Sequence, residues 1–226
     1  MFLFLTTLRR ELNSIKSFLV VIFFIIIAII LGKYSTSVAI LIDAKGNSAL
    51  IDLLFGIYGF LGYLFSAVLF SGIIADEVNT QTMRYLVPYV SKKKIYLAKY
   101  FASLAYFLII VSISLIILFV YRKTIVLPPF AILSVTIFFA YIQALVMLVS
   151  VIAPNGKTAT FINLVIGICL PILYSLAFLK KWFILKIIQY FLPYYYLAKQ
   201  WDNLGLLLIV SVIVFVGIFL FEGKEV

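Results

Sequence analysis

The sequence predicts an all-α integral membrane protein that crosses the bilayer six times. Of its 226 residues, 66% are hydrophobic and only 12% are charged, a balance that a water-soluble domain of this size could not bury. Several apolar stretches reach the length of about 20 residues that a helix needs to span the hydrocarbon core. Apolar and polar residues do not alternate in runs such as 18–31, as barrel strands would require, so we expect helices.

Charge and residue usage narrow the possible functions. The formal net charge is +10, and the basic residues lie between the hydrophobic runs, which favours anionic lipid headgroups over nucleic acid as their partner. The chain has no histidine, and its single cysteine, Cys169, lies in an apolar run. The usual metal clusters, histidine general bases and an intrachain disulfide are therefore missing. We predict no catalytic residue and no metal site.

The first 16 residues have the pattern of a helix that lies in the membrane interface. Apolar side chains recur there at helical spacing, and Thr6, Arg9 and Arg10 fall largely on the other side. A signal peptide is the alternative interpretation, because a charged region precedes a hydrophobic one. However, the charges start late and no convincing cleavage site follows, so we expect an uncleaved interfacial helix.

The whole chain, residues 1–226, is predicted to form one transmembrane domain of six spans. The paired prolines at 128 and 129 separate two spans. Only residues 154–159 separate the fourth span from the fifth, which predicts an antiparallel hairpin. The predicted spans cover residues 17–31, 49–74, 99–120, 130–153, 160–179 and 204–221.

Residues 180–203 are apolar and aromatic, but their lysines make them too charged to cross the membrane comfortably. Trp182, Trp201 and several tyrosines match the aromatic belt at the level of the lipid headgroups. We predict a re-entrant segment of two short, half-inserted helices. Before it, Pro171 in the middle of the fifth span is expected to kink or break that helix.

Asn155-Gly156-Lys157-Thr158 contains the Gly-Lys-Thr ending of a phosphate-binding loop. The full pattern needs a glycine five residues before Gly156, where Val151 stands, and a preceding strand, where a membrane helix is predicted. We therefore interpret the segment as a turn and expect no nucleotide site in this chain.

Few polar side chains fall inside the spans. Tyr58, Tyr63, Gln143 and Asn163 are candidates to line a translocation pathway, and ordinary interhelical hydrogen bonding is the alternative. No chain of buried carboxylates is present, which indicates that the energy for any transport comes from elsewhere.

Small residues follow the second span, with Gly62 and Ser66 in the spacing that lets two helices approach closely. They could pack against another span of this chain or against a second subunit.

The distribution of Lys and Arg favours a cytoplasmic location for both termini. With that orientation the inner segments hold ten of these residues and the outer segments eight. The basic residues before the first span support the same orientation.

The segment 77–86, Glu-Val-Asn-Thr-Gln-Thr-Met-Arg-Tyr-Leu, followed by Ser91-Lys92 and Lys99, resembles a loop in the permease subunits of type-two ATP-binding-cassette exporters. In that family a Glu, a Gly-Thr pair, a Leu, a Pro with Ser-Arg, and a Lys that opens the third span occupy this loop. Here Gln81 stands in place of the glycine and Lys92 in place of the arginine.

The resemblance implies a multi-pass permease of the cell membrane that forms a dimeric pathway with an identical or homologous permease. Separate cytoplasmic ATPase subunits would bind ATP and Mg and dock on the cytoplasmic loop 75–98, while this chain itself would need no cofactor and would not be an enzyme. Within the loop, Glu77 and Arg84 would form ion pairs with the ATPase, Met83 and Leu86 would fill a groove, and Thr82 belongs to the same contact segment.

Other interpretations remain open from the sequence. The loop 75–98 could be a solvated segment whose lysines meet lipid. The chain could also be a membrane-embedded enzyme that modifies lipids, which would need clustered catalytic groups at one membrane face, or a secondary transporter.

Overall fold

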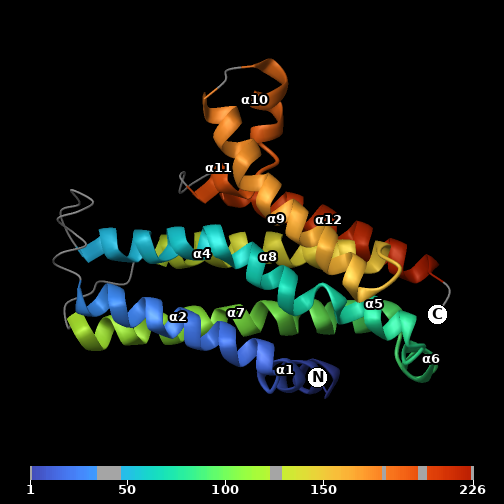
Figure 1. The fold of residues 1–226 in the computed structure, drawn as a ribbon. Helices are drawn as coiled ribbons and strands as arrows, with labels where there is room; N and C mark the ends of the chain where they lie inside the picture. The colour runs from blue at the N-terminus through green and yellow to red at the C-terminus, as the bar shows by residue number, and fades with distance from the viewer. Residues whose placement is uncertain (1, 35–46, 123–128, 180–181, 198–202, 225–226) are drawn as a thin grey trace.

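The computed structural model describes residues 2–34, 47–122, 129–179, 182–197 and 203–224. The structure is 89% helical, and none of the described residues lies in a strand. Six long helices form the body of the molecule (Figure 1). They are α2 (Ile15–Lys33), α4 (Asn47–Phe70), α7 (Lys92–Arg122), α8 (Pro129–Ile152), α9 (Gly156–Leu179) and α12 (Asn203–Gly223).

Six helices in the described part of the chain are long and apolar enough to cross a membrane. The predicted all-α fold and the number of spans are thus confirmed, and the chain is a multi-pass membrane protein by length and composition. The boundaries differ most for the third span, which begins at Lys92 and not at residue 99. Lys92, Lys93 and Lys94 therefore form the first turn of α7 and are not part of a loop.

The fifth span, α9, begins at Gly156 and continues through Pro171 as one helix. The helix break considered at Pro171 does not occur. A proline removes only one backbone donor, whereas ending the helix inside a bilayer would leave several N–H and C=O groups without partners, each at a cost of several kcal/mol.

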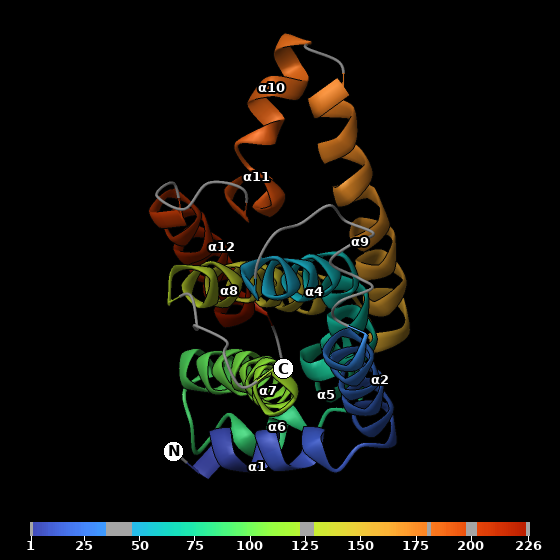
Figure 2. The same cartoon turned by 90° about the vertical axis from the view of Figure 1, so that its left-hand side faces the viewer.

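The long helices pack side by side, with α2 and α7 in one layer and α4 and α8 in the next (Figure 2). Their contact is filled by aromatic rings. Phe24 of α2 stacks on Tyr58 of α4 at 4.3 Å between ring centroids, and Phe107 of α7 stacks on Phe139 of α8 at 4.7 Å. Such ring pairs each add about 0.5–1.5 kcal/mol beyond the burial of their area, so these rings help to hold α2 against α4 and α7 against α8.

Three short helices lie at the end of the bundle where α4 ends and α9 begins. α1 (Phe2–Leu12) packs against α7, while α5 (Gly72–Asn79) and α6 (Met83–Leu86) connect α4 to α7. Both termini are drawn at this end in Figure 1. A helix is thus present within the predicted interfacial segment 1–16, and its position in a membrane interface stays a prediction.

At the other end of α9, the chain forms α10 (Phe183–Gln189) and α11 (Pro193–Leu197). Together with the last turns of α9, α10 stands apart from the other long helices in both ribbon views. Two short helices therefore occupy the described part of the predicted re-entrant segment 180–203. Their insertion into a bilayer stays a prediction.

Candidate functional site

The candidate site is built around α5. The chain leaves α4 at Ser71, whose hydroxyl donates to the carbonyl of Ala67 one turn earlier, and then starts α5 as a new helix. The apolar side of α5, with Ile73, Ile74 and Ala75, is buried against α8 and α9. Its polar side carries Asp76 and Glu77. The predicted loop 75–98 is therefore mostly helical and is fixed to the membrane helices.

Glu77 joins α5 to α1 and α7 through ion pairs. Its Oε2 lies 2.5 Å from Nζ of Lys99 in α7, and its Oε1 accepts from Nη1 of Arg10 in α1 at 2.8 Å. Lys99 is almost fully buried and also donates to the carbonyl of Ile73 at 2.6 Å. A buried lysine is tolerated only when a carboxylate compensates its charge, so Glu77 is required by the fold itself.

α8 supplies the partner for the start of α5. The first N–H groups of a helix have no acceptor within it, and the backbone N–H groups of Ile74 and Ala75 both donate to the hydroxyl of Ser150, each at 3.1 Å. Ser150 is fully buried. One hydroxyl of α8 thus holds two peptide groups of α5.

Asp76 joins α5 to α9. Its Oδ1 accepts from the backbone N–H of Gly156, the first residue of α9, at 3.0 Å, where the helix dipole favours a negative charge. The approach is close: a Cβ on Gly156 would lie 2.1 Å from Oδ1, and a Cβ on Gly72 would lie 2.2 Å from Oδ2. A side chain at either position would therefore force the Asp76 carboxylate to move.

This geometry also explains the Gly-Lys-Thr sequence. Asn155 caps α9, because its Oδ1 accepts from the backbone N–H of Thr158 at 2.9 Å. Gly156 gives its N–H to Asp76. The helix N-terminus that would hold a phosphate in a nucleotide-binding loop is occupied by a carboxylate of this chain, and the segment is the turn between α8 and α9.

We call α5 together with its four bonding partners, Arg10, Lys99, Ser150 and Gly156, the α5 hub. Through it, one short helix is hydrogen-bonded or ion-paired to α1, α7, α8 and α9. A displacement of α5 cannot leave these four elements unchanged.

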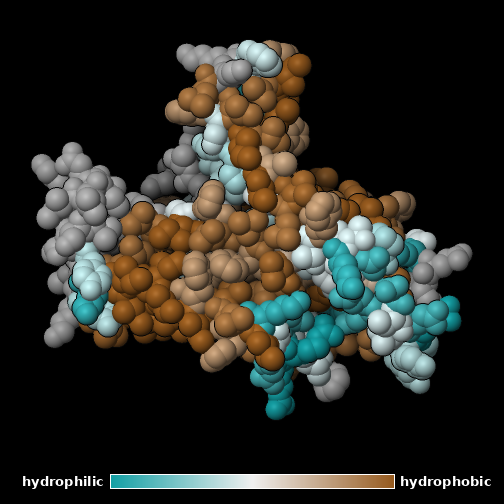
Figure 3. Space-filling view, viewed as in Figure 1, coloured by the Kyte–Doolittle hydropathy of each residue, from teal (hydrophilic) through white to brown (hydrophobic). Residues whose placement is uncertain are grey.

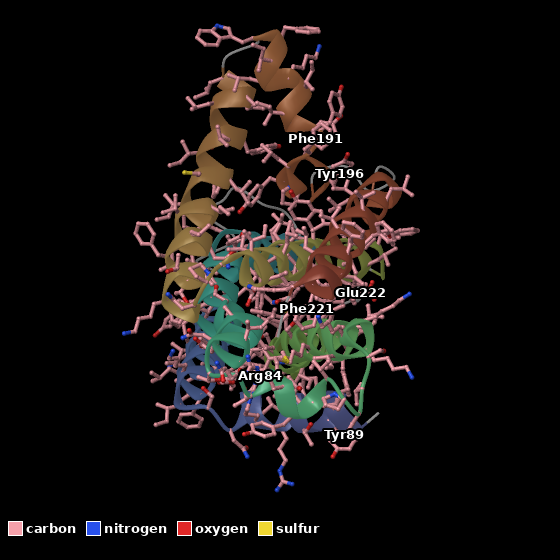
Figure 4. All side chains as sticks on the ribbon, turned by 90° about the vertical axis from the view of Figure 1, so that its right-hand side faces the viewer. Arg84, Tyr89, Phe191, Tyr196, Phe221 and Glu222 are labelled. Carbon is pink, nitrogen blue, oxygen red and sulfur yellow. The ribbon has the colours of Figure 1, made fainter. Side chains whose placement is uncertain are left out.

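Beyond the hub, the segment from Gln81 to Tyr89 forms the outer surface at this end. The turn before α6 is closed by the hydroxyl of Thr82, which donates to the carbonyl of Glu77 at 3.1 Å. Arg84 is exposed, and Tyr85 and Tyr89 are 80% and 87% exposed. Figure 4, which views the molecule from this end, shows Arg84 and Tyr89 beside α6, far from Phe191. Gln81 has a positive φ of 59°, the conformation that glycine adopts without strain.

The structure changes the roles of two predicted contact residues. Glu77 is engaged by Arg10 and Lys99 of its own chain, and Met83 is fully buried within the chain. Neither is therefore positioned to reach a partner protein. Leu86 is half-buried and lines a small cavity with Arg10 and Lys99, whereas Arg84 and Thr82 are at the surface.

The four candidate pathway residues are all buried between helices. Tyr58 is 2.7 Å from the hydroxyl of Ser114, Tyr63 donates to Asn163 at 3.3 Å, and Gln143 donates to the hydroxyl of Ser66 at 2.8 Å. These bonds connect α4 to α7, α8 and α9. The geometry favours interhelical hydrogen bonding over a role in lining an open pathway.

The small residues of α4 serve contacts within the chain. A Cβ on Gly62 would lie 2.8 Å from the ring of Phe139 in α8, and Ser66 accepts the bond from Gln143. Of the two interpretations of their spacing, packing against another span of the same chain is the one observed.

No model of a known protein family matches the chain, and no curated protein matches it in sequence. The hub and its exposed surface are therefore the observations on which a function can be based.

Proposed function

We propose that the chain is the permease subunit of an ATP-driven exporter of the type-two ATP-binding-cassette class, with ATP hydrolysis on a separate cytoplasmic ATPase. The observation that carries this proposal is the α5 hub: a short helix at the end of the bundle that is bonded to four other elements at once. An ATPase that docks beside it gains control over the membrane helices without entering the membrane.

The docking surface in this proposal is formed by Gln81, Arg84, Tyr85 and Tyr89. Exposed tyrosines and an arginine are the residue types that contribute most to binding at protein interfaces. Met83 anchors this surface from below, because it is buried in the same helix, and Thr82 ties it to α5. The surface thus moves together with the hub. In this geometry Glu77 transmits force and does not contact the ATPase.

The second partner in the proposal is another permease, identical or homologous, that packs on α9. Exposed apolar side chains follow one another along that helix at spacings of three or four residues, so they form one continuous stripe. They are Phe161, Val165, Ile168, Ile172, Leu176 and Leu179. Only 17% of the most apolar stretch of α9 is buried within the chain, against 67% for α8, which leaves α9 free for a neighbour.

Alternating access then follows from the connections. ATP-driven approach of two ATPases would move both docking surfaces, and each hub would pass the motion to α9 through Asp76 and to α8 through Ser150. The pathway lies between the two permeases in this mechanism. Such a pathway needs no buried carboxylate in the spans, because the driving force enters at the hub.

The experiment that tests the proposal is co-purification of the full chain with a candidate ATP-binding-cassette ATPase co-expressed with it. Arg84→Glu and Tyr85→Ala should abolish co-elution, because each removes a main contact of the docking surface. Tyr34→Ala is the matched control, since Tyr34 is exposed at the opposite end of α2. Retention of the complex by both docking variants, or its loss in the control, would contradict the proposal.

The dimer is tested separately by cysteine cross-linking in membranes. In a Cys169→Ser background, Ile172→Cys on the apolar stripe should form a disulfide with a second copy of the chain. Ser112→Cys, on an exposed position of α7, should not. A disulfide from position 112 and none from position 172 would place the second permease on another face of the chain.

A further inference from the structure

A cavity of about 550 Å³ lies beside the α5 hub, at the end of the bundle where α1, α4 and α9 meet. Its walls come from the turn between α1 and α2, the last turns of α4, α5 and the first turn of α9. Figure 3 shows hydrophilic side chains gathered at this end of the molecule, next to the broad hydrophobic surface of the long helices. The cavity thus lies where the apolar surface of the long helices meets the polar end of the molecule.

Among the charged residues that line the cavity, the acidic residues have partners within the chain, whereas two lysines take part in no ion pair among the described residues. The acidic groups have partners in the chain: Glu11 pairs with Arg10, Glu77 with Arg10 and Lys99, and Asp76 with the N-terminus of α9. The three ion pairs found among the described residues include neither of the two lysines that line the cavity, Lys16 and Lys157.

These two lysines come from different helices. Lys16 is in the first turn of α2, where the helix dipole adds positive potential. Lys157 is in the first turn of α9, whose N-terminus is already compensated by Asp76. An anion held between them would compensate two charges that the chain itself leaves exposed.

The remaining wall is apolar. Val68 and Leu69 at the end of α4 and Ile73 at the start of α5 line the same cavity, and Val68 is exposed on the helix surface. A ligand that fits both walls needs an anionic group next to an apolar tail. A free anion would satisfy the lysines and leave the apolar wall in water.

We propose that this cavity binds the headgroup of an anionic phospholipid, with the phosphate between Lys16 and Lys157 and the start of an acyl chain along Val68, Leu69 and Ile73. The lipid comes from the leaflet on the side of both termini. Because the cavity is bounded by α1, α5 and α9, the bound lipid links three elements of the hub and stabilises their arrangement. This site is independent of any ATPase or second permease.

The test is lipid binding to the full chain purified in mild detergent, followed by native mass spectrometry and by thermal stability during lipid titration. The probes are dioleoyl phosphatidylglycerol, dioleoyl phosphatidylcholine and inorganic phosphate. Phosphatidylglycerol should bind with about one tightly held copy, more tightly than phosphatidylcholine with the same tails. The double variant Lys16→Gln/Lys157→Gln should weaken phosphatidylglycerol binding about twenty-fivefold, since each lysine near an anionic lipid contributes about fivefold.

The matched control is Lys93→Gln/Lys94→Gln. These two lysines are exposed in the first turn of α7 at the same end of the bundle and do not line the cavity. The control changes the net charge equally and should leave binding unchanged. Val68→Trp should reduce phosphatidylglycerol binding without a change in charge, because the larger side chain fills the apolar wall.

Three results would overturn the proposal. Equal weakening in both lysine pairs would show a general attraction of the basic surface and no defined site. Equal binding of phosphatidylcholine would remove the role of the anionic charge. Inorganic phosphate that alone protects the protein as well as phosphatidylglycerol does would identify a free anion as the ligand.

Discussion

Removing the Glu77 carboxylate should destabilise the chain far more than removing the arginine that also binds it. In Glu77→Gln, Lys99 keeps its bond to the carbonyl of Ile73 but loses its only ion-pair partner among the described residues. The Lys99 side chain is 4% exposed, so water cannot replace the carboxylate. Leaving one charge of a buried pair without its partner costs about 3–5 kcal/mol.

Removing Arg10, the other ion-pair partner of Glu77, should cost much less stability than removing Glu77. The Arg10 side chain is 54% exposed, so solvent screens its attraction to Glu77, and Arg10→Gln should cost only about 0.2–1 kcal/mol. Thermal unfolding of the purified chain in detergent measures the difference. For a chain of this size the melting temperature should fall by roughly 6–20 °C in Glu77→Gln and by only a few degrees in Arg10→Gln.

A double-mutant cycle separates the ion pair from other effects. In Glu77→Gln/Lys99→Gln no buried charge is left without a partner, so the double variant should be more stable than Glu77→Gln alone. Equal small losses in Glu77→Gln and Arg10→Gln would refute the reasoning, as would losses that simply add in the double variant.

Four further variants test individual contacts by thermal unfolding. Gly156→Ala should lose about 1–2 kcal/mol, because the new Cβ displaces Asp76 from the N-terminus of α9; Gly56→Ala, where no atom lies within 4 Å, is the control and should not lose stability. Gln81→Gly should gain about 1 kcal/mol of stability by relieving the positive φ of 59°. A loss of stability would contradict a left-handed backbone at this position. Gly62→Ala should be destabilised by the contact with Phe139, and an unchanged melting temperature would show that α4 and α8 can separate at no cost. Burial raises the pKa of Glu11 above 4.5 despite the opposing effect of Arg10, so the folded chain binds this proton more tightly than the unfolded chain. The stability of the unmodified chain relative to Glu11→Gln should therefore fall as the pH rises from 4.5 through the raised pKa. A stability difference that does not change with pH would contradict the raised pKa of Glu11.

The spans could be predicted from the sequence because their length and apolar content leave no other location for them. The start of α7 could not be predicted in the same way. Three consecutive lysines indicated a soluble loop, yet the stems of Lys92 to Lys94 are long enough to reach polar surroundings from the first turn of a helix. Lys92 donates to the carbonyls of Glu222 and Lys224 at the end of α12, a contact that no local pattern reveals.

The candidate site was predictable only in part. Glu77 and Lys99 were both marked by the resemblance to exporter permeases, but the bond from Arg10 crosses 67 residues of sequence and depends on how α1 packs. Asp76 and Ser150 carried no separate signal, because a carboxylate at a helix N-terminus and a serine within a span each have many ordinary roles. The sequence predicts that Met83 fills a groove of the ATPase, yet it is buried within the chain. A helix of four residues is too short for periodicity to define its buried side.

The most direct test of the proposed function is a cross-link from the docking surface to the ATPase. Tyr85→Cys in a Cys169→Ser background places a single thiol on the exposed side of α6, and Tyr34→Cys places one at the opposite end of α2. With a short bifunctional reagent in membranes that contain both proteins, the variant at position 85 should cross-link to the ATPase and the variant at position 34 should not. An ATPase that co-purifies with the chain but cross-links only from position 34, or from neither position, would contradict docking at α5 and α6.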